Sequence, residues 1–112
     1  MRANQITLMS GIIAAAYSHA VYPGKPKFTI HVDGVTSAGA GTAQIKVWAS
    51  NKLAPSAANN LDWTLLATFD LVTSTTRVSG SNATDAPWAH VRVELVSISG
   101  TDGTVNAYMD VG

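Results

Sequence analysis

Apolar and polar residues alternate along most of the chain from residue 27 onward. In the segment 27–34 (KFTIHVDG), Phe28, Ile30 and Val32 share one parity, while Thr29, His31 and Asp33 share the other. Successive side chains of a β-strand point to opposite faces, so this pattern predicts a strand with one buried face. The same alternation predicts further strands at 42–51, 62–72, 88–99 and 104–111.

Clusters of turn-forming residues separate these strands, at 33–41, 51–60, 79–87 and 99–103. The cluster 99–103 (SGTDG) is short enough to predict a hairpin of the last two strands. The polar segment 74–79 (STTRVS) predicts an edge strand, since polar residues discourage unwanted pairing.

The N-terminal residues 1–25 allow two interpretations, an arm or edge strands. NQITLM favours a strand, whereas GIIAAAYSHAVY fits a strand or a short helix, of which we prefer the strand. Short strands divided by turns at this spacing predict an all-β fold, an antiparallel β-sandwich or jelly roll of about eight strands. No linker or charge block divides residues 1–112, so a single domain is expected.

Charge is sparse and balanced. Seven Lys and Arg residues stand against seven Asp and Glu, and charged residues make up 12% of the 112 residues, where about 25% is usual. A chain without a basic excess lacks the electrostatic footprint of nucleic-acid binding, and nothing in it indicates attraction to an anionic membrane. The deficit of charge is typical of a subunit whose surface is covered by neighbours.

His90, Arg92 and Glu94 occupy alternate positions of the predicted strand 88–99, so all three are expected on its outer face. A base, a cation and a carboxylate in one row are compatible with an active site, which would also need a nucleophile or second carboxylate within hydrogen-bond reach. No nucleophile motif accompanies them, and the predicted hairpin would place Asn106, Tyr108 and Asp110 opposite them, which gives polar and opposite-charge pairs rather than a recognisable catalytic set. We therefore interpret the row as a contact surface and expect no enzymatic activity.

Metal and cofactor sites are not predicted. Of His19, His31, Asp33 and His90, only His31 and Asp33 have a spacing that allows both to bind one ion, and any alternating strand produces that spacing. The glycine-rich segment 38–43 (AGAGTA) lacks the lysine of a phosphate-binding loop and precedes a strand.

The tryptophans add a candidate binding surface. Trp63 shares its parity with Leu65 and Phe69 and is expected in the core, whereas Trp48 shares the parity of polar residues and is expected to point outward. An outward tryptophan serves a protein interface or a sugar-binding platform, or it is a surface residue covered by its local neighbours, and of these we prefer the interface. Trp88 would extend the same surface by its parity with His90. The candidate interface residues are thus Trp48, Trp88, His90, Arg92 and Glu94.

Three segments together resemble small virion structural proteins of tailed bacteriophages: GAGTAQIKVWASN, WTLLATFDL and APWAHVRVELVSISGTDGTVNAYM, within residues 39–111. The resemblance implies a β-sandwich or jelly-roll subunit of the phage particle, in which capsid decoration (cement) proteins usually form trimers at three-fold positions. It provides no catalytic residues.

The resulting hypothesis is a non-enzymatic capsid decoration protein that bridges major capsid subunits. Its expected partners are the major capsid protein and further copies of itself, its expected location is the virion, and its assembly would take place in the cytoplasm of the bacterial host. The alternatives are a tail or tail-fibre component, or a carbohydrate-binding β-sandwich module that uses Trp48.

Overall fold

The computed structural model describes residues 4–23, 28–35, 41–56, 59–73, 78–84, 88–100 and 102–111. Within these ranges the elements are β1 (Asn4–Ile12), β2 (Ala16–Tyr17), β3 (Phe28–Val35), β4 (Gly41–Ser50), the 3₁₀ helix η1 (Asn60–Asp62), β5 (Thr64–Thr73), β6 (Val78–Thr84), β7 (His90–Ile98) and β8 (Thr104–Val111). No helix among the described residues is long and apolar enough to cross a membrane.

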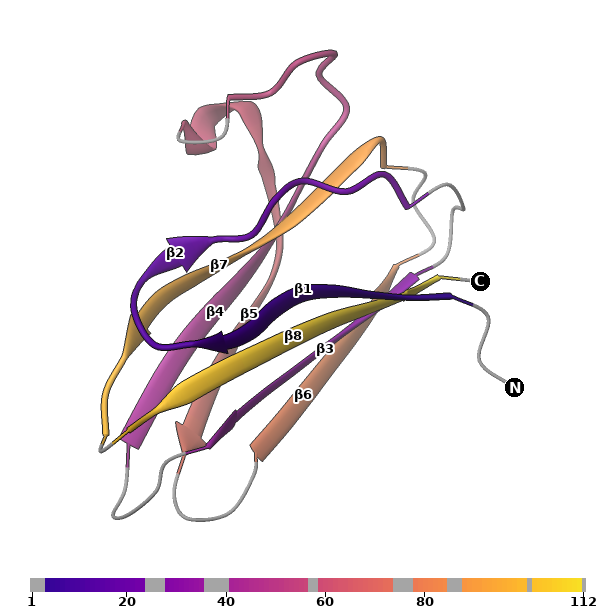
Figure 1. The fold of residues 1–112 in the computed structure, drawn as a ribbon. Coiled ribbons are helices and arrows are strands. Elements are labelled where there is room, and N and C mark those ends of the chain that lie inside the picture. The colour runs from indigo at the N-terminus through magenta and orange to yellow at the C-terminus, as the bar shows by residue number, and fades with distance from the viewer. Residues whose placement is uncertain are drawn as a thin grey trace.

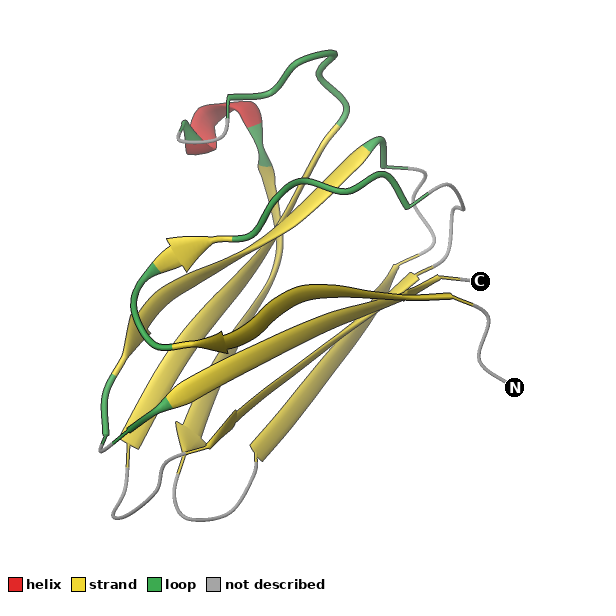
Figure 2. Cartoon of the chain, viewed as in Figure 1, coloured by secondary structure: helices red, strands yellow, loops and turns green. Residues whose placement is uncertain are grey.

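The strands form two antiparallel four-stranded sheets, ordered β1-β8-β3-β6 and β2-β7-β4-β5, which pack face to face (Figures 1 and 2). β1 pairs with β8, β2 with β7, β3 with β6 and β4 with β5, so the chain folds back on itself as one long hairpin wrapped around the core. Such nested pairing is that of a jelly roll. The predicted all-β sandwich is confirmed.

The core lies between the sheets, and its buried side chains from β3, β4, β7 and β8 are those that the alternation assigned to inner faces. Ile45 and Val47 of β4 lie beside Leu95 and Val93 of β7 on the inner face of one sheet, and all four are buried. Fully burying an aliphatic side chain of this kind contributes about 1.5–3 kcal/mol. The remaining buried members include Leu8, Met9, Phe28, Ile30, Val32, Ala43, Ala49, Leu71, Val91, Val105, Ala107 and Met109.

The predicted hairpin of the last two strands is wrong, because β7 and β8 belong to different sheets. In the turn between them, Gly100 and Asp102 adopt positive φ angles of 108° and 52°. The crossing lets the apolar faces of both strands bury against one core, which a flat hairpin would not allow. The outer residues Asn106 and Tyr108 therefore lie opposite Asp33 and His31 of β3, on the far sheet from His90.

The alternation also fails at one position of β5. Val47 is opposite Ala67 and Trp48 is opposite Leu65, so Leu66 is an extra residue, a β-bulge that reverses the faces on its N-terminal side. Ala67, Phe69 and Leu71 face the core as predicted. Leu65, predicted to lie inside, is 43% exposed, and Trp63 is buried outside the main core.

β6 forms an edge of its sheet, as expected of the polar segment, but its limits differ from the prediction. Residues 79–84, predicted as part of a turn, pair with β3 along the whole strand. Pairing with a neighbouring strand thus overrides the turn preference of Ser, Gly and Asn. Residues 74–77 and 85–87 of the predicted strand and turn lie outside the described residues.

The N-terminal residues contribute an edge strand to each sheet. β1 pairs with β8 through two register irregularities, and the backbone N–H of Gly11 donates to Asn106 Oδ1 at 2.8 Å. β2 pairs with β7, placing Ala16 opposite Leu95 and Tyr17 opposite Glu94. The segment following β1 therefore carries the chain from one sheet to the other.

Candidate functional site

Arg92 lies on the outer face of the β2-β7-β4-β5 sheet, on β7 between β2 and β4. Its guanidinium carbon lies 4.0 Å from the ring centroid of Tyr17 and 4.3 Å from that of Trp63, so the two rings enclose the cation. Its Nη2 donates a hydrogen bond to Asn60 Oδ1 at 2.6 Å, and the Tyr17 hydroxyl reaches the same oxygen at 3.3 Å. Arg92 thereby fastens β2 and η1 onto β7, and we call these four residues the arginine clamp.

The clamp corrects the prediction that Arg92 is an outward contact residue, since only 1% of it is exposed. The alternation placed it on the correct face, but that face is covered here. Trp63 reaches Arg92 because the bulge at Leu66 turns the chain outward, and Tyr17 reaches it because β2 pairs with β7.

Burial has a direct electrostatic effect on this arginine. Desolvation lowers the pKa of Arg92 from its ordinary value, while the neighbouring Tyr17 and Glu94 act to raise it. An arginine side chain stays protonated in proteins, so the clamp holds a permanent positive charge. Stacking against two aromatic faces is the form of desolvated cation–π contact that stabilises such a charge best.

Trp48 and Glu94 adjoin the clamp. The Trp48 indole Nε1 donates to Glu94 Oε1 at 3.0 Å, and the Lys46 ammonium lies 5.9 Å from the Trp48 ring centroid. Both side chains are half-buried on the outer face, as predicted for Trp48. The structure therefore brings together three of the five candidate interface residues, Trp48, Arg92 and Glu94.

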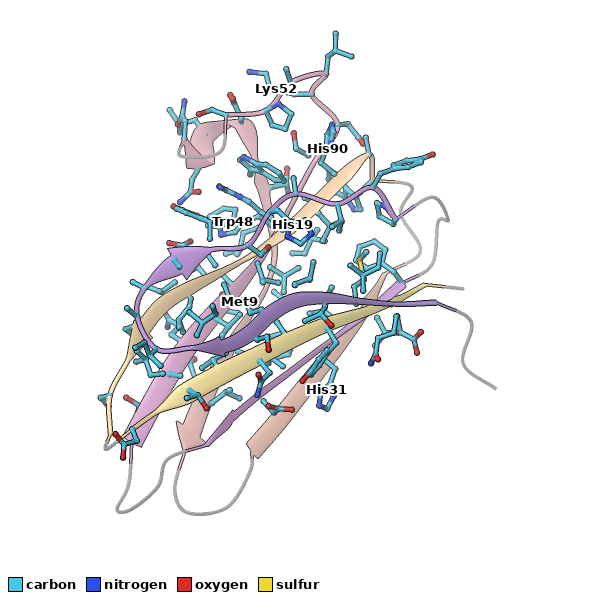
Figure 3. The ribbon with its side chains drawn as sticks, in the orientation of Figure 1. Met9, His19, His31, Trp48, Lys52 and His90 are labelled. Carbon is cyan, nitrogen blue, oxygen red and sulfur yellow. The ribbon has the colours of Figure 1, made fainter. Side chains whose placement is uncertain are left out.

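The other two candidates lie elsewhere. His90, half-buried, begins β7 opposite Ser50, near the end of the sheet (Figure 3). Trp88 packs against the core, which corrects the prediction that it extends the outer surface. The reason is that β7 begins only at His90, and the bend at Ala89 interrupts the alternation before it reaches Trp88.

The connection from β4 to β5, of which the structure describes residues 51–56 and 59–63, carries apolar residues that the sequence interpretation missed. Leu53 is 97% exposed and Leu61 is 92% exposed, in what we call the leucine loop. Leu61 also borders a hollow of about 430 Å³ whose lining includes Lys52, Trp63 and Trp88. A lone leucine in each of the polar stretches NKLAPS and NNLDW was the available signal.

The leucine loop is braced by its own polar groups. Asp62 accepts from Lys52 Nζ at 2.7 Å and from the Ser56 backbone N–H at 2.8 Å, while its carbonyl accepts from the Ser50 hydroxyl. Trp63 Nε1 donates to the Ser56 carbonyl, and Asn59 caps η1 through the Leu61 N–H. A braced loop loses less backbone entropy when its leucines bind a partner than an unbraced loop would.

We expect Asp62 to titrate below its ordinary pKa of 3.8. The hydrogen bond from Lys52, followed by that from the Ser56 N–H, lowers the pKa of this carboxyl group. A carboxylate with a lowered pKa contributes stability above its unfolded-state pKa and loses it as the pH falls through the folded-state value. The Ser56 amide resonance followed by NMR should shift with a midpoint below 3.8, and this transition should be missing in Asp62→Asn; a midpoint at or above 3.8 would contradict the brace.

The residues considered for metal binding do not form a cluster in the part of the chain that the structure describes. Among the described residues there is no group of three His, Asp or Glu side chains that could hold an ion. His31 Nε2 lies 3.7 Å from Asp33 Oδ2, and Asp33 also accepts from Asn106 Nδ2 at 3.0 Å. Figure 3 shows His31 on the sheet opposite the one that carries Trp48 and His90.

Comparison with solved structures is informative about the fold. No protein-family model and no curated protein sequence matches the chain. The SPBc2 prophage-derived protein YomS has a similar crystal structure, with a TM-score of 0.61 at 16% sequence identity, over 97% of this chain and 92% of that one. At this identity the similarity establishes a shared fold.

Proposed function

We propose that the chain is a non-enzymatic structural protein of a bacteriophage particle, and specifically a capsid decoration protein that bridges major capsid subunits. The observation that carries the phage assignment is the prophage origin of the structural neighbour, whose fold matches over nearly the whole chain. It agrees with the resemblance of residues 39–111 to virion proteins of tailed phages.

The leucine loop supports attachment to another protein. Two leucines held almost fully in water are unfavourable in the free subunit, and burying each in a partner regains about 1.5–3 kcal/mol. Weak contacts of this kind become strong when several subunits bind one shell together. Decoration would then follow from many loops docking on neighbouring capsid subunits.

The outer-face residues support a structural role over a catalytic one. Arg92 is enclosed by rings, and Glu94 accepts the Trp48 indole N–H. Side chains with such contacts hold segments of the chain together, so we propose that the arginine clamp stabilises the fold.

Immunogold labelling of purified particles of the encoding phage or induced prophage tests the proposal. Label over the heads, together with the chain in the particle proteome, is the expected result. Label confined to tails would replace capsid decoration by the tail alternative. Absence of the chain from particles would overturn the virion assignment.

We expect no glycan binding that depends on Trp48. Its indole N–H is held by Glu94 and its ring adjoins Lys46, so the side chain is engaged within the protein. On a glycan array, the wild-type chain and Trp48→Ala should give the same signal, with Tyr22→Ala as an exposed aromatic control. A glycan bound by the wild type and by Tyr22→Ala but lost in Trp48→Ala would favour the carbohydrate-binding module instead.

A further inference from the structure

β5 forms an open edge of the β2-β7-β4-β5 sheet. It pairs with β4 along one side, and within the described part of the chain no strand pairs with its other side (Figure 1). An edge of this kind presents unpaired N–H and C=O groups that a further strand can use.

The other sheet edges carry features that discourage such pairing. β1 is interrupted by two register irregularities, β2 is two residues long, and the sequence of β6 is the polar VSGSNAT. The sequence of β5, TLLATFDLVT, contains no Lys, Pro or Gly, and its bulge at Leu66 leaves residues 67–73 in regular register. Phe69 and Ala67 pack against the core yet remain half-buried along this edge.

We infer that β5 pairs antiparallel with β5 of a second copy, about a two-fold axis at Phe69. A two-fold axis perpendicular to a continuous sheet places one residue opposite itself, and every other pair lies symmetrically about it. An axis at Asp70 would set two carboxylates directly opposite each other. An axis at Thr68 would set Asp70 opposite Leu66, which packs toward the core.

An axis at Phe69 gives complementary pairs on both faces. On the core side, this axis places the Phe69 rings of the two copies side by side and sets the small side chain of Ala67 opposite the larger one of Leu71. On the outer face it sets Thr68 opposite Asp70, a polar pair on each side of the axis.

The charges of Lys46 and Asp70 favour a second copy of this chain as the partner that pairs with the open edge of β5. Lys46 of β4 is in register with Thr68, so Asp70 of the second copy would lie two strands from Lys46 on the same face, about 10 Å between backbones. A lysine side chain reaches across an intervening threonine at this spacing. The contact thus pairs Lys46 of one copy with Asp70 of the other, once on each side of the axis. It also joins the two four-stranded sheets into one continuous sheet of eight strands.

Analytical ultracentrifugation of the full chain tests the inference. The wild type should sediment as a dimer. Thr68→Asp, an exposed change that sets carboxylates opposite Asp70 at two symmetric places, should weaken association by about 100-fold. Adding Asp70→Lys to that variant should restore the dimer. Thr7→Asp, the same change on exposed β1, should leave it intact.

A single cysteine gives a second, independent readout, because the chain contains no cysteine. Self-paired residues of antiparallel strands have Cα atoms about 4.5–5.5 Å apart, within the range of a disulfide. Phe69→Cys should form a covalent dimer on mild oxidation, whereas Thr7→Cys should not.

A wild type that sediments as a monomer or a trimer, or an unchanged dimer in Thr68→Asp, would overturn the inference. The inference rests on the open edge of β5 and on the charges of Lys46 and Asp70, and not on capsid attachment. A trimer that decorates heads would leave the proposed function standing, and a dimer missing from particles would leave the β5 contact standing.

Discussion

Replacing Arg92 with alanine should lower the free energy of unfolding by about 3 kcal/mol. The change removes a buried cation from between Tyr17 and Trp63 and leaves Asn60 without its donor from β7. Each enclosed cation–π contact contributes about 2 kcal/mol and the hydrogen bond about 1.5–3 kcal/mol, but these contributions overlap because all involve one side chain.

Urea denaturation followed by circular dichroism measures this loss, and hydrogen exchange locates it. Protection should fall first at β2 and η1, the segments that the clamp holds. Arg92→Lys keeps the charge but not the planar stacking, and should recover less than half of the stability. Lys46→Ala removes the looser contact with Trp48 and should cost below about 1 kcal/mol. A loss in Arg92→Ala no larger than in Lys46→Ala would show that the clamp is not stabilising.

Replacing Leu53 and Leu61 together with serine should abolish attachment to capsids, weakening it by about 100-fold or more. Each leucine loses an apolar contact with the partner of about 1.5–3 kcal/mol, and the loss is multiplied over the subunits that bind one shell. Both side chains are exposed in the free chain, so its unfolding transition should stay almost unchanged. Co-sedimentation with heads from a phage that lacks the gene measures the binding.

Ile13→Ser is the matched control for this variant. Ile13 is 70% exposed and borders a hollow with Ile98 and Gly103, at the end of β7 far from the leucine loop. Heads that retain the Ile13→Ser chain but not the double variant would support docking through the loop. Equal binding by both variants would contradict docking through the leucine loop. The location of the chain on the phage particle would then be tested by immunogold labelling alone.

The sequence predicted which face of most strands is buried, because alternation depends only on local geometry. Val91, Val93 and Leu95 in β7, and Ile45 and Val47 in β4, all face the core as expected. The predicted faces were wrong at the start of β5, where a β-bulge adds one residue that has no partner on β4. Leu66 is this residue, and it moved Trp63 and Leu65 to the opposite face.

The candidate site was harder to predict, since alternation assigns a face but not what covers that face. Arg92 was assigned to the correct side of β7, yet Tyr17 lies 75 positions earlier and Trp63 follows a bulge. The choice between a hairpin and a crossing after residue 98 likewise depends on where both apolar faces can be buried, which is a property of the whole fold.

From the nested pairing of the strands we also expect an order of folding. β4 and β5 form the innermost pair, joined by residues 51–63, and we expect them to meet early, whereas β1 pairs with β8 near the other end of the chain, and the bond from Gly11 to Asn106 spans 95 positions. Contacts of such separation make folding slow. Because β1 is synthesised before its partner β8, we expect a growing chain to carry β1 without this pairing until β8 has emerged.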